Sequence, residues 1–341
     1  MRFNVFTPPH LRPPASVSAM MREVLLALVP GIAAAAGFFG IGVLVNILVA
    51  TVVAVGAEVV MLRLRARPVS VFINDYSAVV TGVLLGIALP PLAPWWLPAL
   101  GSAFAIVFGK HLYGGLGYNP FNPAMVGYVV LLISFPREMT LWLPPAGVGD
   151  GPVGAGEALT RIFTGSLPPG TELDAVSMAT PLDTIKTQLG MARTLGEIQA
   201  GPLFGAIAGR GWQWINMLFL LGGAWLIYRR VIDWRIPAGV LGALAAMALV
   251  FWAADPDLRP GPVFHLFSGA AMLGAFFIAT DPVSAATTPR GRLVYAAGIG
   301  VLVYVIRTWG GYPDGVAFAV LLMNMAAPLI DTYTKPRVFG Q

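Results

Sequence analysis

Long apolar stretches separated by short polar turns run through this chain. If these stretches cross a lipid bilayer, each must form its backbone hydrogen bonds internally, as a helix does, because lipid offers no hydrogen-bonding partner. Hydrophobic residues make up 57% of its 341 residues and charged residues only 11%, against about 25% charged residues in a soluble domain. About ten apolar segments can be distinguished, and several are shorter than the roughly 20 residues of a full helical span. They cover residues 24–38, 41–62, 76–89, 95–110, 122–135, 212–228, 236–253, 264–279, 293–308 and 315–331. The sequence therefore predicts an all-α polytopic membrane protein.

The composition also excludes several kinds of chemistry. The chain has no cysteine, which rules out disulfides, thiolate metal sites and cysteine-ligated clusters. Its three histidines (His10, His111 and His265) are far apart in sequence, so no metal site is predicted. The net charge of +5 does not indicate a nucleic-acid partner, because the basic residues lie in loops between apolar segments. Any redox chemistry here would therefore need an organic cofactor.

The distribution of basic residues predicts the orientation in the membrane. If the N-terminus is cytoplasmic and the segments alternate sides, most of the 21 Lys and Arg residues fall on the cytoplasmic side. Both termini are then expected in the cytoplasm. The long polar loop between the fifth and sixth segments is expected on the other side of the membrane.

The ten segments divide at this loop into five and five, and an odd number of spans per half makes the halves face opposite ways. The third segment of each half is short, and Gly/Pro-rich turns precede the last segment of both. These features are typical of an inverted repeat, in which short interrupted segments mark the central site. The predicted organisation is a cytoplasmic segment 1–23, a first five-helix repeat 24–135, an extracytoplasmic loop 136–211, a second five-helix repeat 212–331 and a cytoplasmic tail 332–341.

The loop contains the most informative run of the chain, Asp174-Ala175-Val176-Ser177-Met178-Ala179-Thr180-Pro181-Leu182. From the residues alone, the simplest interpretation is helix capping. Thr180-Pro181 followed by Asp183 is typical of a helix start, and a helix is expected over 184–195. Loops of this length are, however, usually either functional or disordered. The Thr180 hydroxyl offers an attachment point for a covalent group, so the run has two open interpretations.

The pattern Asp-x-x-Ser-x-Ala-Thr resembles the flavin-attachment motif of two related membrane proteins. These are the D subunit of the Rnf ferredoxin:NAD oxidoreductase complex and the B subunit of the sodium-translocating NADH:quinone reductase. Three further segments resemble parts of this family in the same order: Gly-Tyr-Asn-Pro-Phe-Asn-Pro-Ala at 117–124, Ala-Thr-Asp-Pro-Val at 279–283 and Tyr-Pro-Asp-Gly-Val-Ala-Phe-Ala at 312–319. The short N-terminal region is closer to the Rnf protein. Met178 departs from the family, in which this position often holds a small residue.

The resemblance implies that the Thr180 hydroxyl is esterified to the phosphate of FMN. It assigns Asp174, Ser177 and Ala179 to recognition by the flavin transferase that attaches the group, and it assigns no catalytic residue to this chain. It also implies a protein of the bacterial inner membrane that assembles with the other Rnf subunits. Such a protein relays electrons coupled to Na⁺ or H⁺ movement, with Thr180 on the periplasmic side.

Ionisable residues within spans are functional candidates, because burying them in lipid is costly. Tyr312 and Asp314 share the predicted outer side with Thr180 and are expected near FMN. On the inner side, family members hold a second, noncovalent flavin such as riboflavin. Its expected site is the cluster of Lys110, Tyr118, Asn119, Asn122 and Asp281.

Two simpler expectations concern other residues near span ends. Glu58, Lys110 and Asp331 are more simply read as helix caps or interfacial groups. The tryptophans at span ends are expected in the interfacial belt, with Trp212 and Trp214 the best exceptions because they adjoin the loop.

Two other functions fit the same segments. A solute channel or transporter also uses broken helices and inverted repeats, and it would carry no covalent flavin. A passive assembly scaffold would not depend on Thr180. The sequence does not decide between Na⁺ and H⁺, the direction of electron flow or the ion path. It contains no dinucleotide-binding fingerprint, so NADH chemistry is expected in partner subunits.

Overall fold

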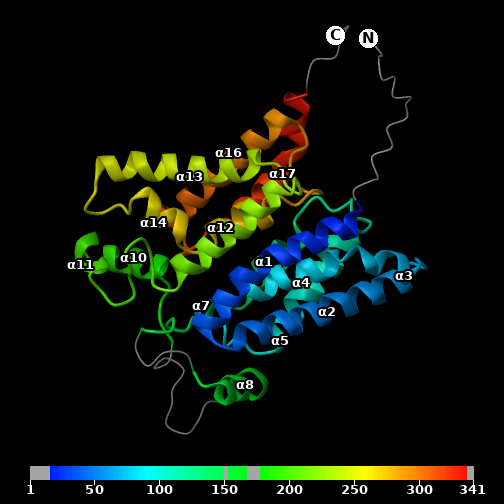
Figure 1. Ribbon diagram of the computed structural model, residues 1–341, viewed down its shortest axis with the longest axis horizontal. Helices are drawn as coiled ribbons and strands as arrows, with labels where there is room; N and C mark the ends of the chain where they lie inside the picture. The colour runs from blue at the N-terminus through cyan, green and yellow to red at the C-terminus, as the bar shows by residue number, and fades with distance from the viewer. Residues whose placement is uncertain (1–15, 149–152, 167–176, 336–341) are drawn as a thin grey trace, which may run out of the picture.

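The structure is a computed structural model that describes residues 16–148, 153–166 and 177–335. The described residues are almost entirely helical, and extended pairing among them is limited to the isolated bridges Trp142–Met178 and Phe204–Gly209. Figure 1 shows two groups of long helices lying side by side, with a set of short helices beyond one end. This confirms the predicted all-α class.

The first group of helices comes from the N-terminal half. It consists of α1 (Val17–Phe39), α2 (Gly42–Leu64), α3 (Val69–Phe72), α4 (Ser77–Ala88), α5 (Trp96–Phe104), which continues as a π-helix over Ala105–Lys110, and α6 (Pro123–Ser134). The second group consists of α12 (Trp212–Tyr228), α13 (Arg235–Ala254), α14 (Pro262–Phe267), α15 (Ala271–Leu273), which continues as a π-helix over Gly274–Ile278, α16 (Pro289–Trp309) and α17 (Val316–Tyr333). The chain between the groups forms α7 (Pro136–Thr140), α8 (Ala155–Thr164), α10 (Pro181–Gly190) and α11 (Leu195–Gln199).

Five of the described helices, α1, α2, α13, α16 and α17, are long and apolar enough to cross a membrane. A sixth span results if Val69–Asp75 and Ser77–Ala88, which meet at a 45° bend, are counted together. The chain is thus a polytopic helical protein, while the arrangement of ten spans in two inverted repeats stays a prediction. The eighth apolar segment, 264–279, is broken between α14 and α15, where Gly269 has a φ of +58°.

Two helix boundaries differ from the sequence expectation. Helix α1 begins at Val17 rather than near residue 24, and its polar first turns are stabilised by a 2.7 Å ion pair between Glu23 and Arg229 at the end of α12. The helix expected over 184–195 instead begins at Pro181 and ends at Gly190, because Ala192 turns the chain with a φ of +61°. In both cases polar residues lie near the helix ends, so the sequence pattern alone did not locate the boundary.

The long helices define two ends of the molecule. At the proximal end, where α1 begins and α12 ends, Asp331 of α17 accepts hydrogen bonds from the Thr287 and Thr288 N–H groups ahead of α16. At the distal end, α1 ends and α12 begins, with the Phe39 and Trp212 ring centroids 5.1 Å apart. The beginning of α1 and the end of α17 thus lie at one end, and α10 follows at the other. The orientation of these two ends in the membrane stays a prediction.

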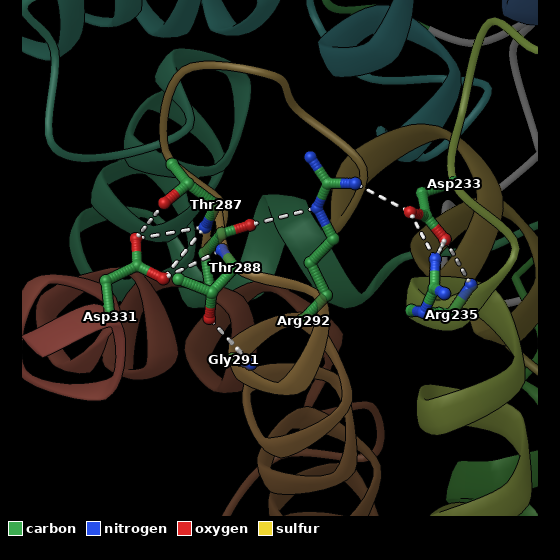
Figure 2. A network of polar contacts seen from close by, with 8 residues as sticks. Asp233, Arg235, Thr287, Thr288, Gly291, Arg292 and Asp331 are labelled. Atoms are coloured by element: carbon green, nitrogen blue, oxygen red, sulfur yellow. Dashed lines mark hydrogen bonds and ion pairs between the residues drawn. The ribbon is translucent and has the colours of Figure 1, made fainter. Parts of the chain in front are cut away.

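A polar network ties the second helix group together at the proximal end (Figure 2). Arg292 at the start of α16 donates to Asp233 at 2.6 Å, and Arg235 at the start of α13 lies 3.1 Å from the same carboxylate. Thr288 caps α16 by accepting the Gly291 N–H at 2.9 Å. The turn between α12 and α13 is therefore fastened to the first turn of α16.

Candidate functional site

Two cavities open at opposite ends of α1, and we call them the distal and the proximal cavity. The distal cavity is bordered by Ala35 and Phe39 of α1 and has an empty volume of about 1280 Å³, its open mouth included. The proximal cavity is bordered by Met20, Met21 and Val24 of the same helix and has about 800 Å³ on the same measure. Clefts between the helices of a bundle are typical places for a cofactor.

Thr180 lies on the wall of the distal cavity and begins α10. Its Oγ accepts a hydrogen bond from the Asp183 N–H at 3.3 Å, and Pro181 occupies the first helical position. The capping interpretation of the motif is thus confirmed, because this hydroxyl satisfies one of the free donors of the first turn. Capping leaves the half-buried hydroxyl at the cavity, so the structural role does not exclude a chemical one.

Hydrogen bonds and close backbone approaches hold α10 in place. Lys186 Nζ donates to the carbonyl oxygens of Gly310 and Tyr312, which precede α17. A Cβ at Gly209 would overlap Pro181, and a Cβ at Gly269 would lie 2.7 Å from Leu182, so both glycines allow a close approach. Burial raises the pKa of Asp183 and lowers the pKa of Lys186, while the attraction between the two charges opposes both shifts. Helix α10 is therefore a fixed part of the cavity wall.

The remaining residues of the motif are placed differently. Ala179 is exposed, and Ser177 is half-buried near Trp142 and Arg161. The Met178 N–H donates to the Trp142 carbonyl at 2.8 Å, which pairs the motif with the segment after α7. Asp174 lies outside the described residues.

Tyr312 and Asp314, predicted to lie near Thr180, share the wall of the distal cavity with it. Asp314 accepts hydrogen bonds from the Ala270 N–H at 2.8 Å and from Arg307 Nε at 3.1 Å. The Arg307 guanidinium is almost fully buried and also donates to the carbonyls of His265 and Ser268. This arginine therefore holds the break between α14 and α15 in place behind the cavity wall.

Four of the five residues predicted for an inner site line the proximal cavity: Lys110, Asn119, Asn122 and Asp281. Tyr118 is 70% exposed and does not line the cavity. Asn122 begins α6 and donates to the Ile278 carbonyl at 3.2 Å, while its N–H donates to Asn324 of α17. These bonds join the first helix group to the second beside the cavity.

Lys110 and Glu58 are buried, in contrast to the interfacial role expected for them. Each is 2% exposed, and Lys110 Nζ lies 2.8 Å from Glu58 Oε1 and 2.8 Å from Ser77 Oγ. His111 Nε2 lies 3.1 Å from the other Glu58 oxygen. The expectation was wrong because charge spacing along the sequence does not show that α2 and the π-helical end of α5 meet. Asp331 is only half-buried and binds the turn ahead of α16, which Thr288 caps.

Sequence reasoning missed several residues at the distal cavity. Phe39 and Trp142 line it together with Trp212, and Lys186 and Arg307 support it from behind. Trp214, which adjoins the loop equally closely in sequence, is 56% exposed and does not line the cavity. About half a turn of helix thus separates a tryptophan at the cavity from one that faces outward.

The fold defines a polytopic α-helical membrane protein with a cavity at each end. A model of the NQR2, RnfD, RnfE family matches residues 4–340, and the chain belongs to this family.

Curated relatives are similar over nearly their whole length. The chain is 53% identical to a protein of Aeromonas hydrophila subsp. hydrophila over 99% of both chains. It is 56% identical to one of Yersinia enterocolitica over 95% of both, and 51% identical to one of Escherichia fergusonii over 100% of this chain and 99% of the relative. Each relative is named as the D subunit of an ion-translocating oxidoreductase complex.

Proposed function

We propose that this chain is the D subunit of an Rnf-type ion-translocating oxidoreductase complex and that Thr180 carries FMN through a phosphoester bond. The protein would relay electrons across the bacterial inner membrane, coupled to Na⁺ or H⁺ movement. The names of the relatives support the membership of a complex. The observation that carries the flavin assignment is the position of the motif threonine at the wall of a large, mostly apolar cavity.

The residues present fit the proposed group. A phosphoester needs a hydroxyl, and Thr180 supplies one with restricted rotamers. The N-terminus of α10 places the positive end of a helix dipole beside that hydroxyl, which favours a phosphate. The rest of the cavity offers aromatic and aliphatic side chains suited to a planar ring. Bound FMN would supply reversible electron transfer, while the protein holds and orients it.

The proximal cavity supports a second part of the proposal, a noncovalent flavin such as riboflavin. Lys110, Asn119 and Asn122 are among the polar residues that line this otherwise mostly apolar cavity. Flavin released from the Thr180→Ala protein by denaturation, identified by chromatography, tests this site. The absence of released flavin would remove this part and leave the covalent site untouched.

The main test is the fate of covalent flavin when Thr180 is replaced. Denatured Thr180→Ala protein, made with a flavin transferase present, is expected to lose all in-gel flavin fluorescence and the mass of one FMN. Thr194→Ala is the matched control, because Thr194 also begins a short helix and accepts the Glu197 N–H at 3.4 Å. Fluorescence that survives in Thr180→Ala, or its absence from the unaltered chain, would refute the assignment.

The two rival functions give different results in the same experiments. A channel or transporter would carry no covalent flavin and would show solute flux in vesicles. A scaffold would leave turnover of the complex unchanged after Thr180→Ala.

The proposed topology places the distal end in the periplasm. Because the chain has no cysteine, single introduced cysteines report their own accessibility. Ser166→Cys is expected to react with an impermeant thiol reagent in intact cells, whereas Lys335→Cys is expected to react only after lysis. The reverse pattern would invert the topology.

A further inference from the structure

Three aromatic rings from separate parts of the chain meet on the wall of the distal cavity. Phe39 ends α1, Trp212 begins α12, and Trp142 lies just after α7. The Trp142 and Trp212 centroids are 4.9 Å apart, and Phe39 lies 5.8 Å from Trp142 and 5.1 Å from Trp212. We call these three residues the aromatic wall. All of them line the same cavity as Thr180.

The backbone fixes the aromatic wall close to Thr180. Met178 pairs with Trp142 through a 2.8 Å hydrogen bond, and two residues of chain span at most about 7 Å. A Cβ built on Gly209 would touch both Pro181 and, at 3.2 Å, Trp212 Cδ1. Thr180 therefore lies between the two segments that supply the indoles, so a flexible group attached to its Oγ would reach the aromatic wall.

The rest of the cavity makes the aromatic wall its best surface for a planar ring. Most of the other lining side chains are aliphatic, and Thr180, Asp183 and Asp314 are among its polar residues. Aromatic faces attract other π systems in stacked or edge-on arrangements, and indole offers the largest such face.

We propose that Trp142 and Trp212, supported by Phe39, position the isoalloxazine ring of the group tethered at Thr180. This inference rests on the proposed function, since it requires covalent flavin at that residue. The two indoles are positioning residues, which hold the ring in the cavity. Tryptophan beside a flavin also has a spectroscopic consequence. Light drives one electron from the indole to the excited ring, and the electron then returns, so the fluorescence is quenched without net chemistry.

The experiment compares flavin fluorescence in the folded and the denatured full-length protein. Signal from other flavins is removed by subtracting the Thr180→Ala protein. The unaltered chain is expected to fluoresce weakly when folded and strongly when denatured. Trp142→Leu and Trp212→Leu are each expected to shift the ring from stacked to unstacked by roughly threefold to tenfold and to raise the folded-state fluorescence. Their flavin circular dichroism should fall as well.

Two further variants separate positioning from general packing. Trp142→Phe and Trp212→Phe keep an aromatic face but supply a poor electron donor, so the circular dichroism should be retained while the fluorescence rises. Trp214→Leu is the matched control, two residues along the same helix, exposed and outside the cavity, and should change neither signal.

The outcomes also separate this inference from the proposed function. No covalent flavin in the denatured unaltered protein would refute the proposed function. Covalent flavin whose folded-state fluorescence and circular dichroism are the same in the Trp142 and Trp212 variants as in Trp214→Leu would overturn the aromatic wall alone.

Discussion

Arg307 Nε lies 3.1 Å from Asp314 Oδ1, and this pair connects the buried break between α14 and α15 to the wall of the distal cavity. The guanidinium is almost entirely buried, while the carboxylate is 24% exposed. The arginine also donates to two backbone carbonyls that no regular helix satisfies. A single charged side chain thus binds the carbonyl groups that are left free where the helix beside the cavity is broken.

Replacing Arg307 by Met should strongly destabilise the protein. The change leaves Asp314 with only the Ala270 N–H and leaves the carbonyls of His265 and Ser268 without this donor, at a cost of about 3–5 kcal/mol. Asp314→Asn should cost less, because the amide oxygen still accepts from Arg307. Thermal unfolding of the purified protein in detergent measures both. If Arg307→Met unfolds at the same temperature as the exposed-site control Arg193→Met, the pair has no structural role.

The buried Glu58–Lys110 pair should show strong energetic coupling. Glu58→Gln or Lys110→Met alone leaves one charge buried without its partner, which costs about 3–5 kcal/mol. The double variant removes both charges and should cost clearly less than the sum of the two single changes. The unfolding free energies of the unaltered protein, the two single variants and the double variant give the coupling energy directly. Additive effects would mean that the two groups do not interact in the membrane.

Lys186 should control the docking of α10. Lys186→Met removes the bonds to Gly310 and Tyr312, so the amides of α10 are expected to exchange hydrogen faster while those of α16 stay protected. Hydrogen exchange followed by mass spectrometry resolves the two helices. Arg193→Met, which follows the end of α10, is the control. Unchanged exchange in α10 would show that its apolar contacts suffice.

The proximal network predicts a pH dependence of stability. Burial alone would raise the pKa of Asp233, but hydrogen bonds from Arg235 and Arg292 outweigh it and hold the pKa below its ordinary value. The network therefore stabilises the fold above the ordinary Asp pKa of about 3.9, and this contribution is lost as the pH falls through the lower pKa of the folded state.

Asp233→Asn should therefore lower the unfolding free energy by about 1 kcal/mol at neutral pH, and the difference from the unaltered protein should shrink below about pH 4. Unfolding midpoints over a pH series measure this. Asp257→Asn, at an exposed position, should lie within about 0.5 kcal/mol of the unaltered protein throughout. A difference for Asp233→Asn that is constant with pH would contradict the assignment.

Long apolar runs predicted the all-α class and where the long helices lie. All ten predicted segments overlap helices, since lipid-facing helices require long apolar runs and polar turns end them. Only five or six satisfy the length and composition expected of a span. The break at Gly269 stayed hidden inside an apolar run, because a single glycine does not show that Arg307, far along the chain, bonds the freed carbonyls.

The candidate site was predicted in part. The motif placed Thr180 at a helix start, and the topology placed Tyr312 and Asp314 on the same side, where all three line one cavity. Nothing in the sequence marked Trp142 or Phe39 as part of a site, since aromatic residues near span ends are usually interfacial. Their contribution depends on the pairing of Met178 with Trp142, a contact between residues far apart in sequence.

The residue proposed to carry the cofactor is also the residue that begins α10. An ester phosphate at that position would bring negative charge to the positive pole of the helix dipole, which is worth roughly 0.3–1 kcal/mol. A loaded chain would then hold its first turn more firmly than an unloaded one. Attachment of the cofactor would thus make one short helix more rigid, in addition to colouring the protein.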